Sequence, residues 1–123
     1  MRVRAVDFVG VPVPDMARAQ EFYRDVLGLA PLSEHSGWSE YDAGNMTVSL
    51  FTEQGMRNPS PSMRNALLAL AVEDMATALA EVTGKGAAIV QETAEYTPCY
   101  MAIIADPFGN SIILHQRKDG TAG

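Results

Sequence analysis

The heptapeptide VPDMARA at residues 13–19 recurs as VEDMATA at residues 72–78, with five of its seven positions identical. Each copy follows an apolar stretch that predicts a strand and precedes an amphipathic pattern that predicts a helix. Asp15 and Asp74 stand at the helix starts, where a carboxylate can accept a hydrogen bond from a backbone N–H of the first turn. We interpret the recurrence as a duplicated strand–helix unit rather than two unrelated junctions with similar capping residues.

Short strand patterns separated by turn residues follow each predicted helix. They cover residues 30–35, 38–43 and 46–52 in the first half, and 88–93, 100–105 and 111–116 in the second. Each half therefore reads as strand, helix and three strands. We predict a single domain made of module one (3–52), a connector (53–65), module two (66–116) and a tail (117–123). A half of this size leaves a sheet edge and an apolar face uncovered, so two halves or two chains must complete each other.

Composition excludes several classes of partner. The net charge is −6 with a pI near 4.7, and the nine basic residues are scattered. Nucleic acids and anionic membrane surfaces need a concentrated positive patch, so neither is expected as a partner. No apolar run approaches the roughly 20 residues of a membrane span. The single cysteine, Cys99, cannot form an internal disulfide. We expect a cytoplasmic protein.

Two further segments carry a resemblance to a known family. VPVPDMARAQEFYRDVLGL at residues 11–29 and IADPFGNSIILHQ at residues 104–116 resemble the vicinal oxygen chelate superfamily, which includes glyoxalase I, extradiol dioxygenases and bleomycin resistance proteins. The resemblance implies an α+β fold of two tandem βαβββ modules, whose curved mixed sheets surround a cup-shaped cavity. It also implies a small-molecule ligand and a homodimer.

Most enzymes of that superfamily hold a divalent metal in the cup. The resemblance places their histidines on the first strand of each module and their glutamates on the last strand. In this chain those positions carry Phe8, Leu67, Ser49 and Ile113. Of the adjacent residues only Asp7 could coordinate a metal. We therefore predict that the superfamily metal is absent and that no cofactor is bound.

Strand alternation predicts which side chains face the cup. Phe8 should share a face with Gly10, Ser49 with Phe51, and Ile113 with His115. Small side chains beside bulky ones would leave an apolar pocket, although they could instead pack tightly against each other. With the aromatic residues outside the helices, the predicted ligand-binding set is Phe8, Trp38, Tyr41, Ser49, Phe51, Leu67, Tyr100, Ile113 and His115.

Three functions remain open from the sequence. The first is a metal-free, drug-sequestering protein that binds a hydrophobic or aromatic small molecule, as in antibiotic resistance. The second is a lyase, isomerase or dioxygenase-like enzyme, either metal-free or with atypical metal ligands. His115 is the candidate acid or base by its face, and Glu92 or a tyrosine is an alternative. The third is a structural dimer whose cup is filled by side chains.

Overall fold

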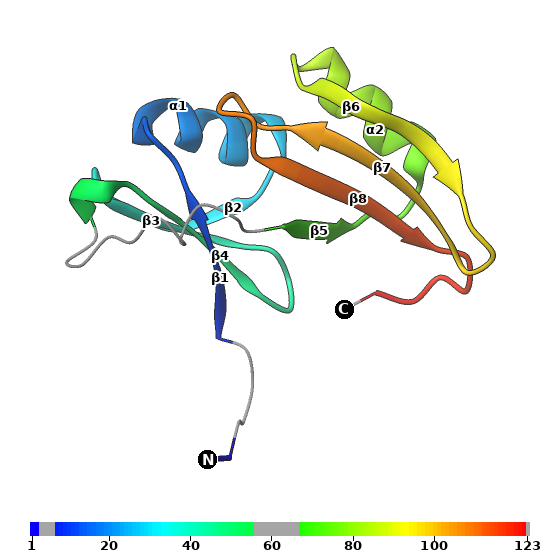
Figure 1. The fold of residues 1–123 in the computed structure, drawn as a ribbon, viewed down its shortest axis with the longest axis horizontal. Coiled ribbons are helices and arrows are strands. Elements are labelled where there is room, and N and C mark those ends of the chain that lie inside the picture. The colour runs from blue at the N-terminus through cyan, green and yellow to red at the C-terminus, as the bar shows by residue number, and fades with distance from the viewer. Residues whose placement is uncertain (3–6, 56–66, 123) are drawn as a thin grey trace.

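The computed structural model describes residues 1–2, 7–55 and 67–122, which form two four-stranded sheets (Figure 1). The sheet of module one has the order β1(Phe8–Pro12), β4(Thr47–Phe51), β3(Trp38–Asp42), β2(Ala30–Glu34). That of module two has the order β5(Leu68–Ala71), β8(Ser111–Arg117), β7(Cys99–Ala105), β6(Ala88–Glu95). β1 pairs with β4, and β5 with β8, in parallel, and the other neighbouring strands are antiparallel. The predicted α+β fold with mixed sheets is confirmed, and the sheets do not close into a barrel.

Each module carries one helix, which starts where the repeat predicts. Asp15 Oδ1 accepts from the Arg18 N–H at 3.1 Å, and Asp74 Oδ2 accepts from the Thr77 N–H at 2.9 Å. The helices are α1(Met16–Gln20), which continues as the π-helix η1(Glu21–Val26), and α2(Met75–Gly84). Among the described residues, no helix is long and apolar enough to span a membrane.

Some of the predicted segments cannot be compared with the structure. The predicted connector begins with the short 3₁₀ helix η2(Glu53–Gly55), and its remainder lies outside the described residues. The predicted start of module one, residues 3–6, Ala66 at the start of module two, and Gly123 of the tail also lie outside them.

The two copies of the repeat make the same backbone contact. The Val13 N–H donates to the Phe51 carbonyl at 2.8 Å, and the Val72 N–H donates to the His115 carbonyl at 2.9 Å. The strand registers agree with this equivalence, because Gly10 pairs with Ser49 while Ala69 pairs with Ile113. Ser49 and Ile113 therefore occupy the same place in the two modules, as do Phe51 and His115.

Each sheet has one covered face and one open face. The covered faces supply most of the single hydrophobic core, in which the largest fully buried side chains include Tyr23, Tyr41, Leu50, Ile104 and Ile112. Alternate residues on the same strands point to the opposite side. These open faces carry Phe8, which is 51 % exposed, and Leu67, which is 67 % exposed and precedes β5.

A buried carboxylate connects the two modules. Asp106, in the turn between β7 and β8, is 5 % exposed, and its Oδ2 accepts from the Tyr23 hydroxyl of η1 at 3.2 Å. The backbone N–H groups of Phe108 and Asn110 donate to Oδ1 at 2.9 and 2.8 Å. Asn110 Nδ2 also donates to the carbonyl of Pro12 in β1 at 3.1 Å. Figure 1 shows this turn lying beside the module-one helix.

Substitution of Tyr23 by Phe tests this connection. Burial, together with the charge of Asp106, holds the pKa of Tyr23 well above its usual range, so the hydroxyl stays a donor at neutral pH. Its removal should lower the free energy of unfolding by about 1–3 kcal/mol, because a buried carboxylate oxygen loses a partner. Urea denaturation measures the change, and Tyr96→Phe, at a tyrosine 48 % exposed, is the control. Equal stability of the two variants would show that the contact does not stabilise the fold.

Candidate functional site

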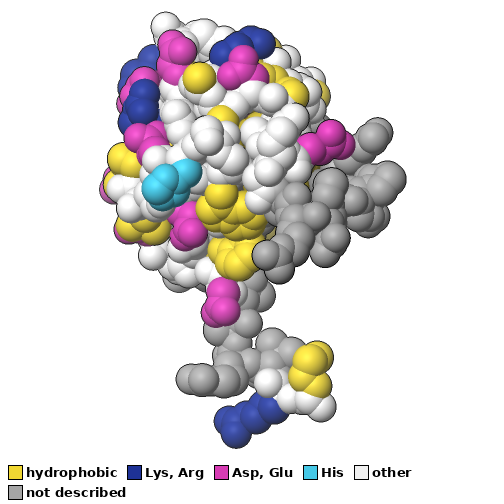
Figure 2. All heavy atoms as spheres, turned by 90° about the vertical axis from the view of Figure 1, so that its left-hand side faces the viewer, with side chains coloured by type: hydrophobic (Ala, Val, Ile, Leu, Met, Phe, Trp, Pro, Cys, Tyr) yellow, Lys and Arg dark blue, Asp and Glu magenta, His cyan; other side chains and the backbone are white. Residues whose placement is uncertain are grey.

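The open face of module one carries three aromatic side chains in contact, which we call the aromatic cluster. The rings of Phe8 and Trp38 meet edge to face with centroids 5.9 Å apart. Trp38 and Phe51 stack with centroids 5.7 Å apart and planes inclined by 24°. Figure 2 views the module-one side of the molecule, where hydrophobic side chains gather beside acidic ones. The aromatic cluster is a partly exposed apolar surface suited to stacking with a planar molecule.

The aromatic cluster brackets a row of three residues on neighbouring strands: Gly10, Ser49 and Glu40. Phe8 belongs to the row on one side of it and Trp38 to the row on the other. Phe8 and Trp38 are separated by four residues along the strand direction and by two strands across the sheet. Their backbones are therefore more than about 13 Å apart. Because the rings nevertheless touch, the two side chains lean toward each other over the middle row.

The middle row contains an unusual polar pair. Ser49 is 1 % exposed, and its Oγ has no hydrogen-bond partner among the described residues. Glu40 Oε1 accepts from Trp38 Nε1 at 3.2 Å, which fixes the indole to the sheet. Gly10 leaves space for a ring, since a Cβ there would lie 3.1 Å from Phe51 Cε1. The sequence predicted Phe8, Ser49 and Phe51 on this face. Glu40 was not among the predicted residues, although it lies two residues after Trp38 on β3 and so points to the same side.

The corresponding face of module two carries no equivalent of the aromatic cluster among the described residues. Leu67 is exposed, and Ile113 and His115 are partly exposed on β8. Across the ladder Ile113 pairs with Ile103 and His115 pairs with Met101. The equivalents of Ser49 and Glu40 are therefore Ile113 and Ile103. The two places of the polar pair therefore both carry isoleucine in module two.

A groove of about 780 Å³ lies between the modules, apart from the aromatic cluster. Its apolar walls include Val9 and Val48 of module one and Leu70 of module two. Of the predicted ligand-binding residues, only Leu67 and His115 line it. Charged side chains also line it, namely Asp42, Glu81 and Arg117. His115 thus lines the same groove as these charged residues.

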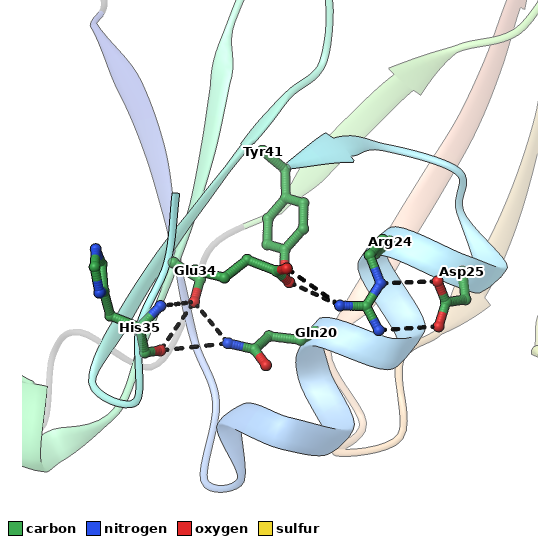
Figure 3. A network of polar contacts seen from close by, with 7 residues as sticks. Gln20, Arg24, Asp25, Glu34, His35 and Tyr41 are labelled. Atoms are coloured by element: carbon green, nitrogen blue, oxygen red, sulfur yellow. Dashed lines mark hydrogen bonds and ion pairs between the residues drawn. The ribbon is translucent and has the colours of Figure 1, made fainter. Parts of the chain in front are cut away.

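Two predicted ligand-binding tyrosines lie on covered faces, away from the aromatic cluster. Tyr41 is fully buried, and its hydroxyl donates to Glu34 Oε2 at 2.5 Å, next to Arg24 (Figure 3). Burial, then the hydrogen bond to Glu34, raises the pKa of Tyr41. Tyr100 lies under Lys118, whose Nζ is 5.1 Å from the ring centroid. Strand alternation could have predicted this placement. Tyr41 follows Glu40 and Tyr100 precedes Met101, so each tyrosine points to the face opposite to these open-face neighbours.

The donor set at the superfamily's metal positions does not fit a divalent cation. Phe8, Leu67 and Ile113 offer no ligating atom, and Ser49 offers only a neutral hydroxyl. Catalytic metals of this kind are held by imidazole and carboxylate ligands. In the part of the chain that the structure describes, no group of three His, Cys, Asp or Glu side chains could hold a metal ion.

Comparison with known proteins identifies the fold and gives one family match. Residues 5–114 match the family model of the Glyoxalase/Bleomycin resistance protein/Dioxygenase superfamily. A search of curated proteins finds no match.

Solved structures with similar folds include one described as an antibiotic binding protein and one described as a lyase. TnmS3, an antibiotic binding protein from Streptomyces sp. CB03234, is 24% identical with a TM-score of 0.80, covering 96% of this chain and 99% of that chain. Lactoylglutathione lyase from Agrobacterium tumefaciens is 18% identical with a TM-score of 0.75, covering 94% of this chain and 95% of that chain. TioX from Micromonospora sp. ML1 is 17% identical with a TM-score of 0.78, covering 93% and 99%. At these identities the similarity shows the fold alone.

Two buried serines on opposite faces of β3 and β4 make a matched stability test. Ser39 Oγ accepts from Gln20 Nε2 and from the His35 N–H, and donates to the His35 carbonyl. Ser39→Ala should therefore lower the free energy of unfolding by about 1–3 kcal/mol. Ser49→Ala should leave it unchanged or raise it, because the Ser49 hydroxyl has no partner to lose. Urea denaturation of both variants checks this, and a loss at Ser49 as large as that at Ser39 would reveal an unrecognised partner.

The metal content of the protein is a second prediction. Protein purified without chelators should hold far less than one equivalent of Fe, Mn, Ni, Co or Zn per chain, because the four positions lack imidazole and carboxylate donors. Elemental analysis by plasma mass spectrometry measures this. Treatment with EDTA should leave the melting temperature unchanged. A stoichiometric metal that survives dialysis would overturn the prediction.

Proposed function

Because the chain belongs to the Glyoxalase/Bleomycin resistance protein/Dioxygenase superfamily, we propose that it binds a hydrophobic or aromatic small molecule without the superfamily metal. The binding surface is the open face of module one. The observation that carries the proposal is the aromatic cluster, in which Phe8 is half exposed although it contacts Trp38. Large aromatic side chains left partly open to solvent in mutual contact are typical of ligand-binding surfaces.

Three further observations support a binding protein of the drug-sequestering type. The residues at the metal positions supply no site for metal-assisted chemistry. The similar fold of TnmS3, an antibiotic binding protein, shows that this architecture can serve binding. Gly10 removes a side chain from the row that the aromatic rings lean over, which makes room for the rings. A role in antibiotic resistance follows if the ligand is a toxic natural product.

We also propose that a homodimer completes the ligand site. The open face of module two carries exposed Leu67 and partly exposed Ile103 and Ile113, an apolar surface that a second copy would remove from water. A face of module two from one chain over the aromatic cluster of the other would give a ligand apolar walls on both sides. The predicted cytoplasmic location stays a prediction from the sequence.

An enzymatic function is the alternative, and the position of His115 favours it. This imidazole lines the inter-module groove together with Glu81 and Arg117, where it could exchange a proton with a bound molecule. The similar fold of a lactoylglutathione lyase is compatible with this alternative. The aromatic cluster lies outside that groove, so the two functions predict different binding residues.

Substitution of Trp38 by Ala tests the proposed function. A planar aromatic ligand such as acridine should bind the wild-type protein in isothermal titration calorimetry, and Trp38→Ala should weaken its affinity by about tenfold or more, because the ligand loses the indole ring on which it stacks. Tyr96→Ala, which removes an exposed aromatic ring from module two, should bind like wild type. Equal affinities of the two variants would place the ligand elsewhere. A weakened affinity in His115→Ala alone would favour the groove.

A further inference from the structure

We propose that Ser49 and Glu40, which we call the polar floor, select a cationic planar aromatic ligand that carries N–H donors. The inference rests on the proposed function and names the class of ligand that the same face takes. Ser49 lies in the middle row, buried between the rows of Phe8 and Trp38, and the Glu40 carboxylate of the same row lies at the edge of the Trp38 ring, where it accepts from the indole N–H. Both groups can accept a hydrogen bond from a ligand held against those rings.

Ser49 is the first observation that points to a ligand. Its side chain is 1 % exposed, and its hydroxyl has no partner among the described residues. A buried hydroxyl without a partner is costly, and native proteins retain very few of them. Ser49 lies on the open side of β4, with the parity of Phe51 and in register with Gly10 and Glu40. The group that satisfies the hydroxyl must therefore approach from the open side.

The arrangement of the aromatic cluster allows a ligand group to reach Ser49. Phe8 is 51 % exposed and touches Trp38 only edge to face, so its ring can swing outward without disturbing the core. Trp38 is held more firmly, because its indole N–H donates to Glu40 and its ring stacks on Phe51. A planar ligand that replaces the Phe8 edge would lie on the Trp38 ring and over the polar floor.

The charge of this face specifies the ligand further. Two acidic side chains, Glu40 and Asp42, alternate with buried residues along β3 and so share the open side. The residues that β1, β3 and β4 place on this side include no Lys or Arg. A cation would gain from the Glu40 carboxylate and from the π face of Trp38, whereas an anion would be repelled.

The second module shows that the fold does not require a polar floor. The places equivalent to Ser49 and Glu40 carry Ile113 and Ile103, on the corresponding strands β8 and β7 and in the same register. Two aliphatic residues suffice there for the sheet to form. The polar pair in module one is therefore a property of this face rather than a structural need of the βαβββ unit.

Three tricyclic compounds of similar shape test the inference at neutral pH: 9-aminoacridine, which is a cation with N–H donors, neutral acridine, and anionic anthracene-9-carboxylate. Calorimetry gives the affinities. Quenching of intrinsic tryptophan fluorescence locates the ligand, because Trp38 is the only tryptophan in the chain. We expect 9-aminoacridine to bind about tenfold or more tighter than acridine, and anthracene-9-carboxylate to bind most weakly.

Two variants assign the preference to the polar floor. Glu40→Gln keeps an acceptor for the Trp38 indole but removes the charge, so it should reduce the advantage of 9-aminoacridine over acridine by about tenfold. Ser49→Ala should weaken 9-aminoacridine by about threefold to tenfold. The matched controls are Glu95→Gln, which removes one charge from module two, and Ser39→Ala, on the covered face. Both controls should keep the wild-type preference.

The outcomes separate this inference from the proposed function. If all three compounds quench Trp38 with equal affinity, or if the preference survives in both Glu40→Gln and Ser49→Ala, the polar floor does not select the ligand and the inference is wrong. The proposed function would then still stand. If none of the three compounds binds, the proposed function fails and the inference fails with it.

Discussion

The buried carboxylate of Asp106 is the interaction on which the arrangement of the two modules depends. It accepts hydrogen bonds from its own turn and from the Tyr23 hydroxyl, while Asn110 of the same turn reaches the carbonyl of Pro12. A 5 % exposed carboxylate is tolerated only because its oxygens are satisfied. The contact fixes the module-one helix against the sheet of module two. The covered faces of both sheets then share one core.

In each module one face of the sheet packs into the core. The side chains on the other face are therefore not required for that packing. The covered positions must be apolar or fully hydrogen-bonded, as Ser39 and Tyr41 are through Gln20, His35 and Glu34. The open positions follow no such rule. Module one uses them for the aromatic cluster and for Ser49 and Glu40, whereas module two carries Ile113 and Ile103 at the places of Ser49 and Glu40.

The sequence predicted the elements of this fold because their signals are local. The capping aspartates, the repeat and the strand alternation each act over a few residues, and the structure contains the corresponding helices and strands. The contact between Tyr23 and Asp106 joins residues 83 apart, so no local pattern could reveal it. The π-helical turn, in which the Leu27 N–H donates to the Phe22 carbonyl at 3.0 Å, also has no simple signature in composition. The placement of Phe8, Ser49 and Ile113 on open faces followed from the resemblance, which puts them at the superfamily's metal positions, together with strand parity. Tyr41 and Tyr100 were chosen for their chemistry and lie on covered faces.

The repeated βαβββ arrangement allows the two modules to be compared position by position. This comparison shows that the polar pair is specific to module one. The same strand register relates Gly10 and Ser49 to Ala69 and Ile113, so differences between these positions do not come from differences in backbone. An unpartnered buried hydroxyl would be removed by the change to an aliphatic side chain that module two already carries. The presence of this hydroxyl beside Glu40, in a side chain only 1 % exposed, is explained when a ligand supplies the missing hydrogen bond.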